Sequence, residues 1–205
     1  LSPAVDAALP GLIDRVREAG CDVLLVTADA PVLGAREWDQ RNYRAPMKLS
    51  VPSMLDVLAH PRWLREVMIP HGAPTFENLT EFLPPGQYSA LIGAKYSFSQ
   101  INSQLSWRDI ERIRSRWQGK LVVKGLLCVE DARRAVEAGV DGIVLSNHGG
   151  RQLDGALSAV ELLPAVEAEC GARLTLMVDG GFRRGTDVLK ALALGADAVL
   201  LGRSV

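Results

Sequence analysis

The sequence predicts an α/β fold, a TIM (β/α)8 barrel present as a partial barrel of about five βα units with a long lid insertion. Three observations support this. Segments 18–27, 137–146 and 193–202 read alike, each with a helix end, a glycine, an aspartate and an apolar strand. Uninterrupted apolar strands are typical of a parallel sheet covered on both faces. Polar residues follow the strands, and such barrels carry their chemistry at that end.

The expected elements alternate along the chain. Strands are predicted within 18–27, over 121–124, 143–145 and 174–179, and within 193–202. Amphipathic helices are predicted over 10–19, 129–138, 159–169 and 186–194. The glycine that closes a helix before a strand, such as Gly139, suits the left-handed conformation of a helix end. Because only five strands can be counted, a doubly wound open sheet is the alternative architecture.

The segment over 30–119 is longer than a plain βα crossover needs. We therefore expect a single domain over 1–205 that carries 30–119 as an insertion. Within it, residues 54–69 form two short amphipathic stretches broken at Pro61. They predict a lid over the barrel mouth. Alternatively, the Trp, Met and Leu side chains of 50–70 contact a membrane surface, with Arg62 and Arg65 at headgroup level.

Composition limits the class of protein. With 205 residues and 48% apolar content, the chain can bury a sizeable core, and a net charge of -1 provides no broad basic surface for nucleic acid. Three single cysteines, Cys21, Cys128 and Cys170, fit neither a disulfide framework nor a metal site, which indicates a reduced, cytoplasmic setting. No apolar run reaches the roughly 18 residues of a membrane span. A first residue other than methionine suggests a piece of a longer protein.

The run 146–155 places a proton acceptor and a cation directly after a strand. His148 can take a proton near neutral pH, and Arg151 can bind a carboxylate through two parallel hydrogen bonds. Gly149 and Gly150 give the backbone freedom for both side chains to face one opening. The alternative is a surface turn with a solvated histidine and arginine.

The last two strand exits predict a phosphate site. After the fourth strand, glycine N–H groups, an arginine and the start of the next helix favour an anion. The residues concerned are Asp179, Gly180, Gly181, Phe182 and Arg183, joined from the next exit by Gly202 and Arg203. A plain tight turn is the alternative. The ends of the first three predicted strands carry further polar residues on the same rim, namely Thr27, Asp29, Lys124 and Ser146.

Four ordered motifs, at 27–37, 122–125, 146–155 and 179–187, resemble the FMN-dependent 2-hydroxy acid dehydrogenases and oxidases. By this resemblance, His148 is the catalytic base and Asp29 stabilises its imidazolium form. Arg151 would hold the substrate carboxylate, with Arg36 assisting substrate binding. Lys124 would lie beside the N1 and C2 carbonyl edge of the flavin.

The resemblance also implies the remaining cofactor contacts. Thr27 and Ser146 would hydrogen-bond the flavin ring or its side chain. The ribityl and phosphate end would be held by Asp179, Gly180, Gly181, Phe182, Arg183, Gly202 and Arg203.

The implied activity is oxidation of an L-2-hydroxy acid, lactate- or mandelate-like, to the 2-oxo acid. The insertion, including 60–63, resembles the branch with (S)-mandelate and L-lactate dehydrogenases, which pass electrons to membrane quinones. Oxidases that use dioxygen are the competing branch. A homotetramer, cytoplasmic or peripheral on the inner face of the membrane, is expected for the full-length protein.

Two other function classes stay open. A phosphate-binding barrel isomerase or nucleotide dehydrogenase shares the glycine and arginine exits but does not need His148 and Arg151 at this spacing. A half-barrel could also bind only the FMN phosphate without catalysis. Complete relatives carry three further strands before this region, so we expect open sheet edges and weak FMN binding for this chain alone.

Overall fold

A computed structural model describes residues 3–30, 34, 43–44, 48–72, 75, 77, 83, 92–93, 96 and 105–202. The chain divides into two compact units. One consists of Leu1–Gly34 with Asn102–Val205, and the other of Ala35–Ile101.

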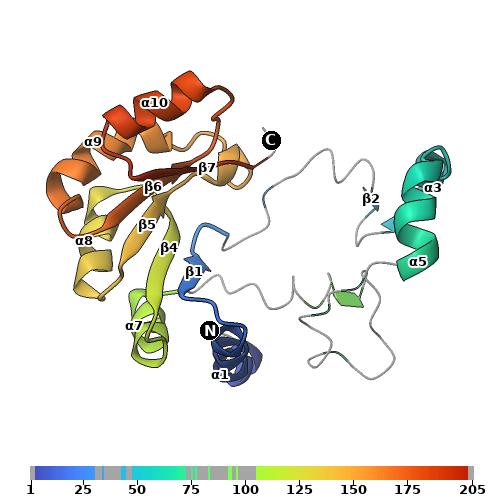
Figure 1. Ribbon diagram of the computed structural model, residues 1–205, viewed down its shortest axis with the longest axis horizontal. Coiled ribbons are helices and arrows are strands. Elements are labelled where there is room, and N and C mark those ends of the chain that lie inside the picture. The colour runs from blue at the N-terminus through green and yellow to red at the C-terminus, as the bar shows by residue number, and fades with distance from the viewer. Residues whose placement is uncertain are drawn as a thin grey trace. The chain divides into compact units, whose positions relative to one another are not determined.

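The first unit is built on a five-stranded parallel sheet (Figure 1). Its strands are β1 (Val23–Thr27), β4 (Lys120–Leu126), β5 (Gly142–Leu145), β6 (Thr175–Asp179) and β7 (Ala198–Leu200). The order in the sheet is β1-β4-β5-β6-β7, so each strand pairs with the next strand along the chain. A doubly wound sheet reverses its strand order at a switch point. The described strands show no such reversal, and the doubly wound alternative is therefore wrong.

Helices alternate with the strands, and all of them but the one before β4 were predicted. They are α1 (Pro3–Glu18), α7 (Trp107–Arg116), α8 (Val129–Glu137), α9 (Ala159–Cys170) and α10 (Gly185–Ala193). The predicted start of the first helix at Pro10 is wrong, because the helix begins at Pro3 and Pro10 lies inside it. Proline suits the first turn of a helix, where its missing N–H has no partner to lose. The sequence reasoning also missed α7, which Ser106 and Asp109 open with a reciprocal capping box.

The core lies between this sheet and its helices. Leu121, Ile143, Leu163 and Val166 have no exposed surface and belong to one apolar cluster, to which β4, β5, α8 and α9 all contribute. All four residues of β5 are buried. The expectation that the strands are covered on both faces fails for β1, where Val23 is 54% exposed. The reason is that β1 lies at an edge of the described sheet.

The repeated Gly-x-Asp sequence has a structural role at the start of the strands. Gly139 and Gly195 adopt the predicted positive φ, at 71° and 103°. The Asp141 carboxylate accepts the Leu121 N–H at 2.9 Å. The Asp197 carboxylate accepts the N–H of Leu176 at 2.7 Å. Each aspartate therefore ties its own strand to the preceding neighbour and helps to fix their register.

The second unit contains α3 (Val51–Leu58), α4 (Pro61–Trp63), the π-helical η1 (Leu64–Met68) and α5 (Ile69–His71), with a short antiparallel pair, β2 (Tyr43–Arg44) and β3 (Lys48–Leu49). The predicted break at Pro61 is confirmed, because His60 is non-helical at φ -109° and ψ 68° and Pro61 opens the next helix. None of the residues of α3, α4, η1 and α5 is buried.

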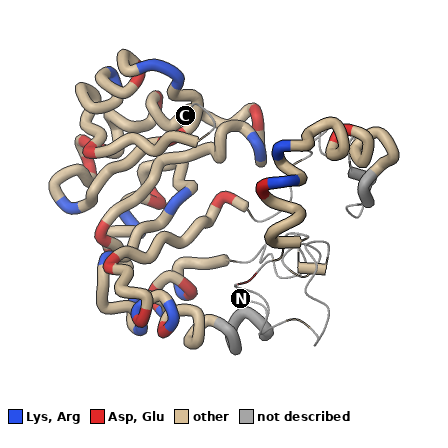
Figure 2. Tube along the Cα trace, turned by 45° about the vertical axis from the view of Figure 1, so that its right-hand side comes forward, with Lys and Arg blue, Asp and Glu red and all other residues tan. Residues whose placement is uncertain are grey.

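Charge is mixed over the first unit. Basic and acidic residues are interspersed along its helices (Figure 2), for example Arg133, which pairs with Glu130 and Glu169. Among the described residues, no helix combines the length and apolar character needed to span a membrane.

Candidate functional site

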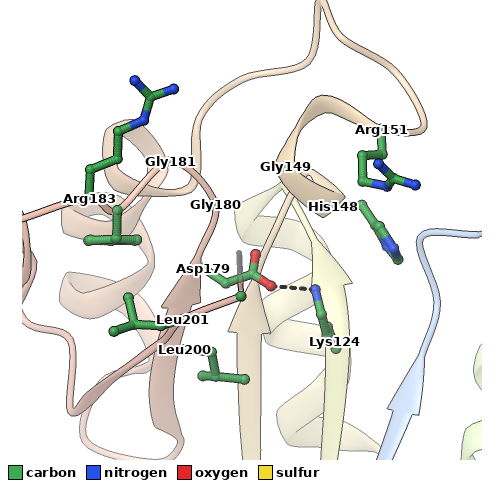
Figure 3. Close-up of a pocket in the computed structure, with 12 residues that line it drawn as sticks. Lys124, His148, Gly149, Arg151, Asp179, Gly180, Gly181, Arg183, Leu200 and Leu201 are labelled. Atoms are coloured by element: carbon green, nitrogen blue, oxygen red, sulfur yellow. Dashed lines mark ion pairs between the residues drawn. The ribbon is translucent and has the colours of Figure 1, made fainter. Parts of the chain in front are cut away.

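The carboxyl ends of the central strands open into one cavity of about 890 Å³ (Figure 3). It is lined by Lys124, His148, Gly149, Arg151, Asp179, Gly180, Gly181, Phe182, Arg183, Leu200, Leu201 and Gly202. In Figure 3, His148 and Arg151 lie on one side of the cavity and Arg183 on the other, with Lys124 and Asp179 between them. The proton acceptor and the predicted anion cradle therefore share one rim.

His148 is held by Asp29 from the loop after β1. Its Nδ1 lies 2.9 Å from Asp29 Oδ1. Because a carboxylate only accepts, the hydrogen of this bond belongs to Nδ1, and Nε2 is left to accept a proton. The His148 backbone has φ 57°, a left-handed conformation uncommon outside glycine. Gly149 and Gly150 continue in that conformation, so the turn that carries His148 depends on the glycine pair.

Ser146 joins the two sides of the site. Its buried hydroxyl accepts from Lys124 Nζ at 2.6 Å and from the His148 N–H at 2.9 Å, and it donates to Asp29 Oδ2 at 3.4 Å. A hydroxyl has one hydrogen and two acceptor lone pairs, and all three are engaged. The lysine and the histidine pair are therefore connected through one side chain.

Lys124 and Asp179 form the central ion pair. Lys124 Nζ lies 2.6 Å from Asp179 Oδ2 and 3.9 Å from Asp29 Oδ2. The side chains of Lys124 and Asp179 are only 16% and 18% exposed, so each charge needs its partner. The other oxygen, Asp179 Oδ1, is buried and has no hydrogen-bond partner among the described residues. Such an oxygen can accept from a hydroxyl group of a ligand.

A glycine in β4 makes room for Asp29. Gly125 has φ 100° and lies where the pairing of β4 with β5 shifts by one residue between Lys124 and Leu126. A Cβ at Gly125 would lie 2.6 Å from Asp29 Cγ. The sequence motif at 122–125 included Gly125 but did not predict that it leaves space for Asp29. The signal that could have predicted this is a glycine inside an apolar strand, which often marks a bulge or a close approach of another group.

The predicted anion cradle is formed by the turn from β6 to α10. Gly180 and Gly181 have φ 91° and 80°. The Asp187 carboxylate accepts the N–H groups of Arg183 at 3.1 Å and Arg184 at 3.0 Å, and these bonds hold the pKa of Asp187 below its usual range. The turn is thus fixed at the start of α10, where the helix dipole favours an anion.

Most predicted site residues meet in this region. Thr27 is paired in register with Lys124 at the end of β1 but is not part of the cavity lining. Arg36 and Arg203 lie outside the described residues. The cavity also includes Leu200 and Leu201, which sequence reasoning missed because they read as ordinary strand residues.

Comparison with known proteins gives consistent matches. The model of the family described as FMN-dependent dehydrogenase matches residues 3–205. An L-lactate dehydrogenase of Xanthomonas oryzae pv. oryzae (strain PXO99A) is 42% identical over 196 residues, which cover 94% of this chain and 49% of that protein. One of Acinetobacter baylyi (strain ATCC 33305 / BD413 / ADP1) is 39% identical, covering 94% and 50%.

Solved structures agree with the sequence matches. A crystal structure of (S)-mandelate dehydrogenase, described as a monotopic membrane protein, has a TM-score of 0.85 and 41% identity, covering 95% of this chain and 51% of that one. A mandelate oxidase has a TM-score of 0.68 and 36% identity, covering 96% and 47%. The chain spans about half the length of these relatives, as expected for a partial barrel. With its family model matched from residue 3 to residue 205, this chain belongs to the FMN-dependent dehydrogenase family.

Proposed function

We propose that the protein carrying this chain oxidises an L-2-hydroxy acid, lactate- or mandelate-like, to the 2-oxo acid with FMN. The observation that carries the proposal is the single cavity in which His148, oriented by Asp29, lies with Lys124, Arg151 and the glycine turn after β6. The names of the relatives, L-lactate dehydrogenase and (S)-mandelate dehydrogenase, support this substrate class.

The residues of the cavity fit FMN. A volume of about 890 Å³ lies within the range of ligand pockets. The unpartnered Asp179 Oδ1 suits a ribityl hydroxyl, and Gly180, Gly181 and the start of α10 suit a phosphate. Lys124 would provide the cation beside the ring, with Thr27 and Ser146 as further contacts. Phe182, Arg183, Gly202 and Arg203 would complete the phosphate end. FMN, when bound, supplies the acceptor for the two electrons that leave the substrate.

The other side of the cavity serves the substrate in this proposal. Arg151 binds the carboxylate in a fixed orientation, assisted by Arg36. His148 accepts a proton at Nε2, and the adjacent Asp29 carboxylate stabilises the imidazolium that forms. A phosphate-binding isomerase would not need both His148 and Arg151 at this site.

We further propose that the electrons pass to a membrane quinone rather than to dioxygen, and that α3, α4, η1 and α5 contact the membrane surface. Apolar side chains on these elements are exposed: Val51 65%, Leu55 61%, Leu58 65% and Ile69 78%. The spacing of Val51, Leu55 and Leu58 puts them on one face of α3, and an exposed apolar face is typical of an interaction site. The monotopic membrane character given for the similar (S)-mandelate dehydrogenase supports the same interpretation. A lid role for 30–119 and a tetramer stay predictions.

The experiment is anaerobic addition of L-lactate or (S)-mandelate to the intact FMN-loaded protein and to its His148→Gln variant. We expect the flavin absorbance of the wild type to bleach. His148→Gln should retain FMN but bleach about 10²–10⁴ times more slowly, because a positioned base contributes that much.

Two outcomes would contradict the proposal. Wild-type protein that binds FMN but never bleaches would favour the non-catalytic reading. Bleaching at the wild-type rate in His148→Gln would remove His148 from the role of base. Reoxidation rates with a quinone and with dioxygen then separate the two acceptors, and faster reoxidation by dioxygen would overturn the quinone proposal.

A further inference from the structure

Two loops of the site are joined at a second point, away from the His148–Asp29 pair. The backbone N–H of Gly34 donates to the side-chain Oε1 of Gln152 at 2.8 Å. Gly34 follows Asp29 by five positions on the loop after β1, and Gln152 follows His148 by four positions on the loop after β5. Both contacts lie within the first unit.

The approach of the two loops is too close for a side chain at position 34. A Cβ on Gly34 would overlap the backbone carbonyl oxygen of Arg151 and would lie 3.0 Å from Gln152 Oε1. The backbone of Gly34 therefore rests directly on the residue that carries the guanidinium. We call the hydrogen bond and this backbone contact together the Gly34–Gln152 clasp.

The clasp changes what determines the position of Arg151. With only the His148–Asp29 bond, the loop after β5 would be held on one side of Arg151. The clasp holds it on the other side as well, so Arg151 lies between two fixed points.

We infer that Gln152, through the Gly34–Gln152 clasp, is a positioning residue that sets the guanidinium of Arg151 for the substrate carboxylate. Gln152 does not line the cavity. It acts through Arg151, and its role rests on the proposed function. Effects on substrate binding should therefore exceed effects on FMN, because neither Arg151 nor Gln152 is among its proposed contacts.

The test compares two variants in the intact FMN-loaded protein. Gln152→Met keeps the side-chain length but removes the acceptor, and Gln152→Glu keeps an acceptor oxygen. Gln118→Met is the matched control, because Gln118 is exposed and precedes β4 at the opposite end of the strands. Amide hydrogen exchange of the peptide containing Gly34, the KM and kcat for the 2-hydroxy acid, and the Kd of FMN are measured for each.

The loss of one hydrogen bond corresponds to roughly a three- to tenfold change in an equilibrium constant. We expect Gln152→Met to accelerate exchange at Gly34 and raise KM by about that factor, with the Kd of FMN within about twofold of wild type. Gln152→Glu should retain slow exchange and most of the substrate affinity. Gln118→Met should match wild type in every readout.

Unchanged exchange at Gly34 in Gln152→Met would show that the clasp does not form. Faster exchange with unchanged KM would show that the clasp exists but does not position Arg151. If the wild-type protein oxidises no 2-hydroxy acid, the proposed function fails and the positioning role with it. The exchange measurement would still report separately whether the clasp forms.

Discussion

At the residue scale, the site depends on one side chain, that of Ser146, whose hydrogen-bonding capacity is fully used. Ser146 contacts Lys124, His148 and Asp29 at once. A lysine and an aspartate that are largely removed from water are costly unless paired, and Lys124 and Asp179 form that pair. Gly125 is as important to the site as Ser146 although it has no side chain, because Asp29 occupies the space that a Cβ at position 125 would need.

The sequence predicted the catalytic candidates but not how they are connected. Their positions followed from the rule that the ends of parallel strands meet on one edge, which needs no side-chain detail. The Gly34–Gln152 clasp and the bulge at Gly125 could not be predicted in the same way. The clasp depends on the distance between loops that are 118 residues apart, and no local pattern specifies that distance.

At the element scale, the strands are aligned by aspartates at their N-terminal ends. Asp141 accepts from the Leu121 N–H, Lys120 Nζ and Arg114, each at 2.9 Å. Partial burial alone would raise the pKa of Asp141, but these hydrogen bonds and the two positive charges outweigh it and hold the pKa below its ordinary value. A lowered pKa in the folded state means that ionised Asp141 stabilises the fold.

Asp141→Asn is therefore expected to reduce the free energy of unfolding by about 1–3 kcal/mol at neutral pH, because it removes the charge that these donors share. The difference from wild type should be fully present above the ordinary pKa of 3.8 and should disappear as the pH falls through the lower pKa of the folded state. Urea unfolding at several pH values measures it.

Asp14→Asn is the control for this prediction, since the Asp14 side chain is 58% exposed and forms a surface ion pair with Arg17. Its effect should stay within about 0.5 kcal/mol. A pH-independent difference for Asp141→Asn would show that the stabilisation does not come from its charge.

The elements that the sequence predicted have clear local signals. Strands with continuous apolar runs and the predicted helices after the first were found within a few residues, whereas the first helix begins at Pro3 rather than at Pro10. The helix α7 was missed because it is rich in charge, and its fully buried apolar residues are only Ile110 and Ile113. Its one clear signal is Ser106 followed by Asp109, which begins a helix through a capping box.

At the scale of the whole molecule, the exposed apolar side chains of α3 and α5 in the second unit support a binding surface. Replacing Leu58 and Ile69 with aspartate should weaken binding of the intact protein to anionic phospholipid vesicles by about tenfold or more, because each buried aliphatic side chain contributes roughly 1.5–3 kcal/mol. Vesicle sedimentation measures this binding.

Leu189→Asp is the matched control, because Leu189 is 66% exposed on α10 and Leu58 is 65% exposed on α3. Equal losses in Leu189→Asp and in Leu58→Asp alone would attribute the effect to charge alone. Wild-type protein that does not sediment with vesicles would contradict the membrane proposal.

The central claim is that one cavity holds both the acceptor of electrons and the acceptor of the proton. The most direct measurement is the amount of 2-oxo acid formed when L-lactate or (S)-mandelate is added anaerobically to the FMN-loaded protein without any other acceptor. We predict one 2-oxo acid for each FMN reduced. No 2-oxo acid from protein with bound FMN would contradict this claim.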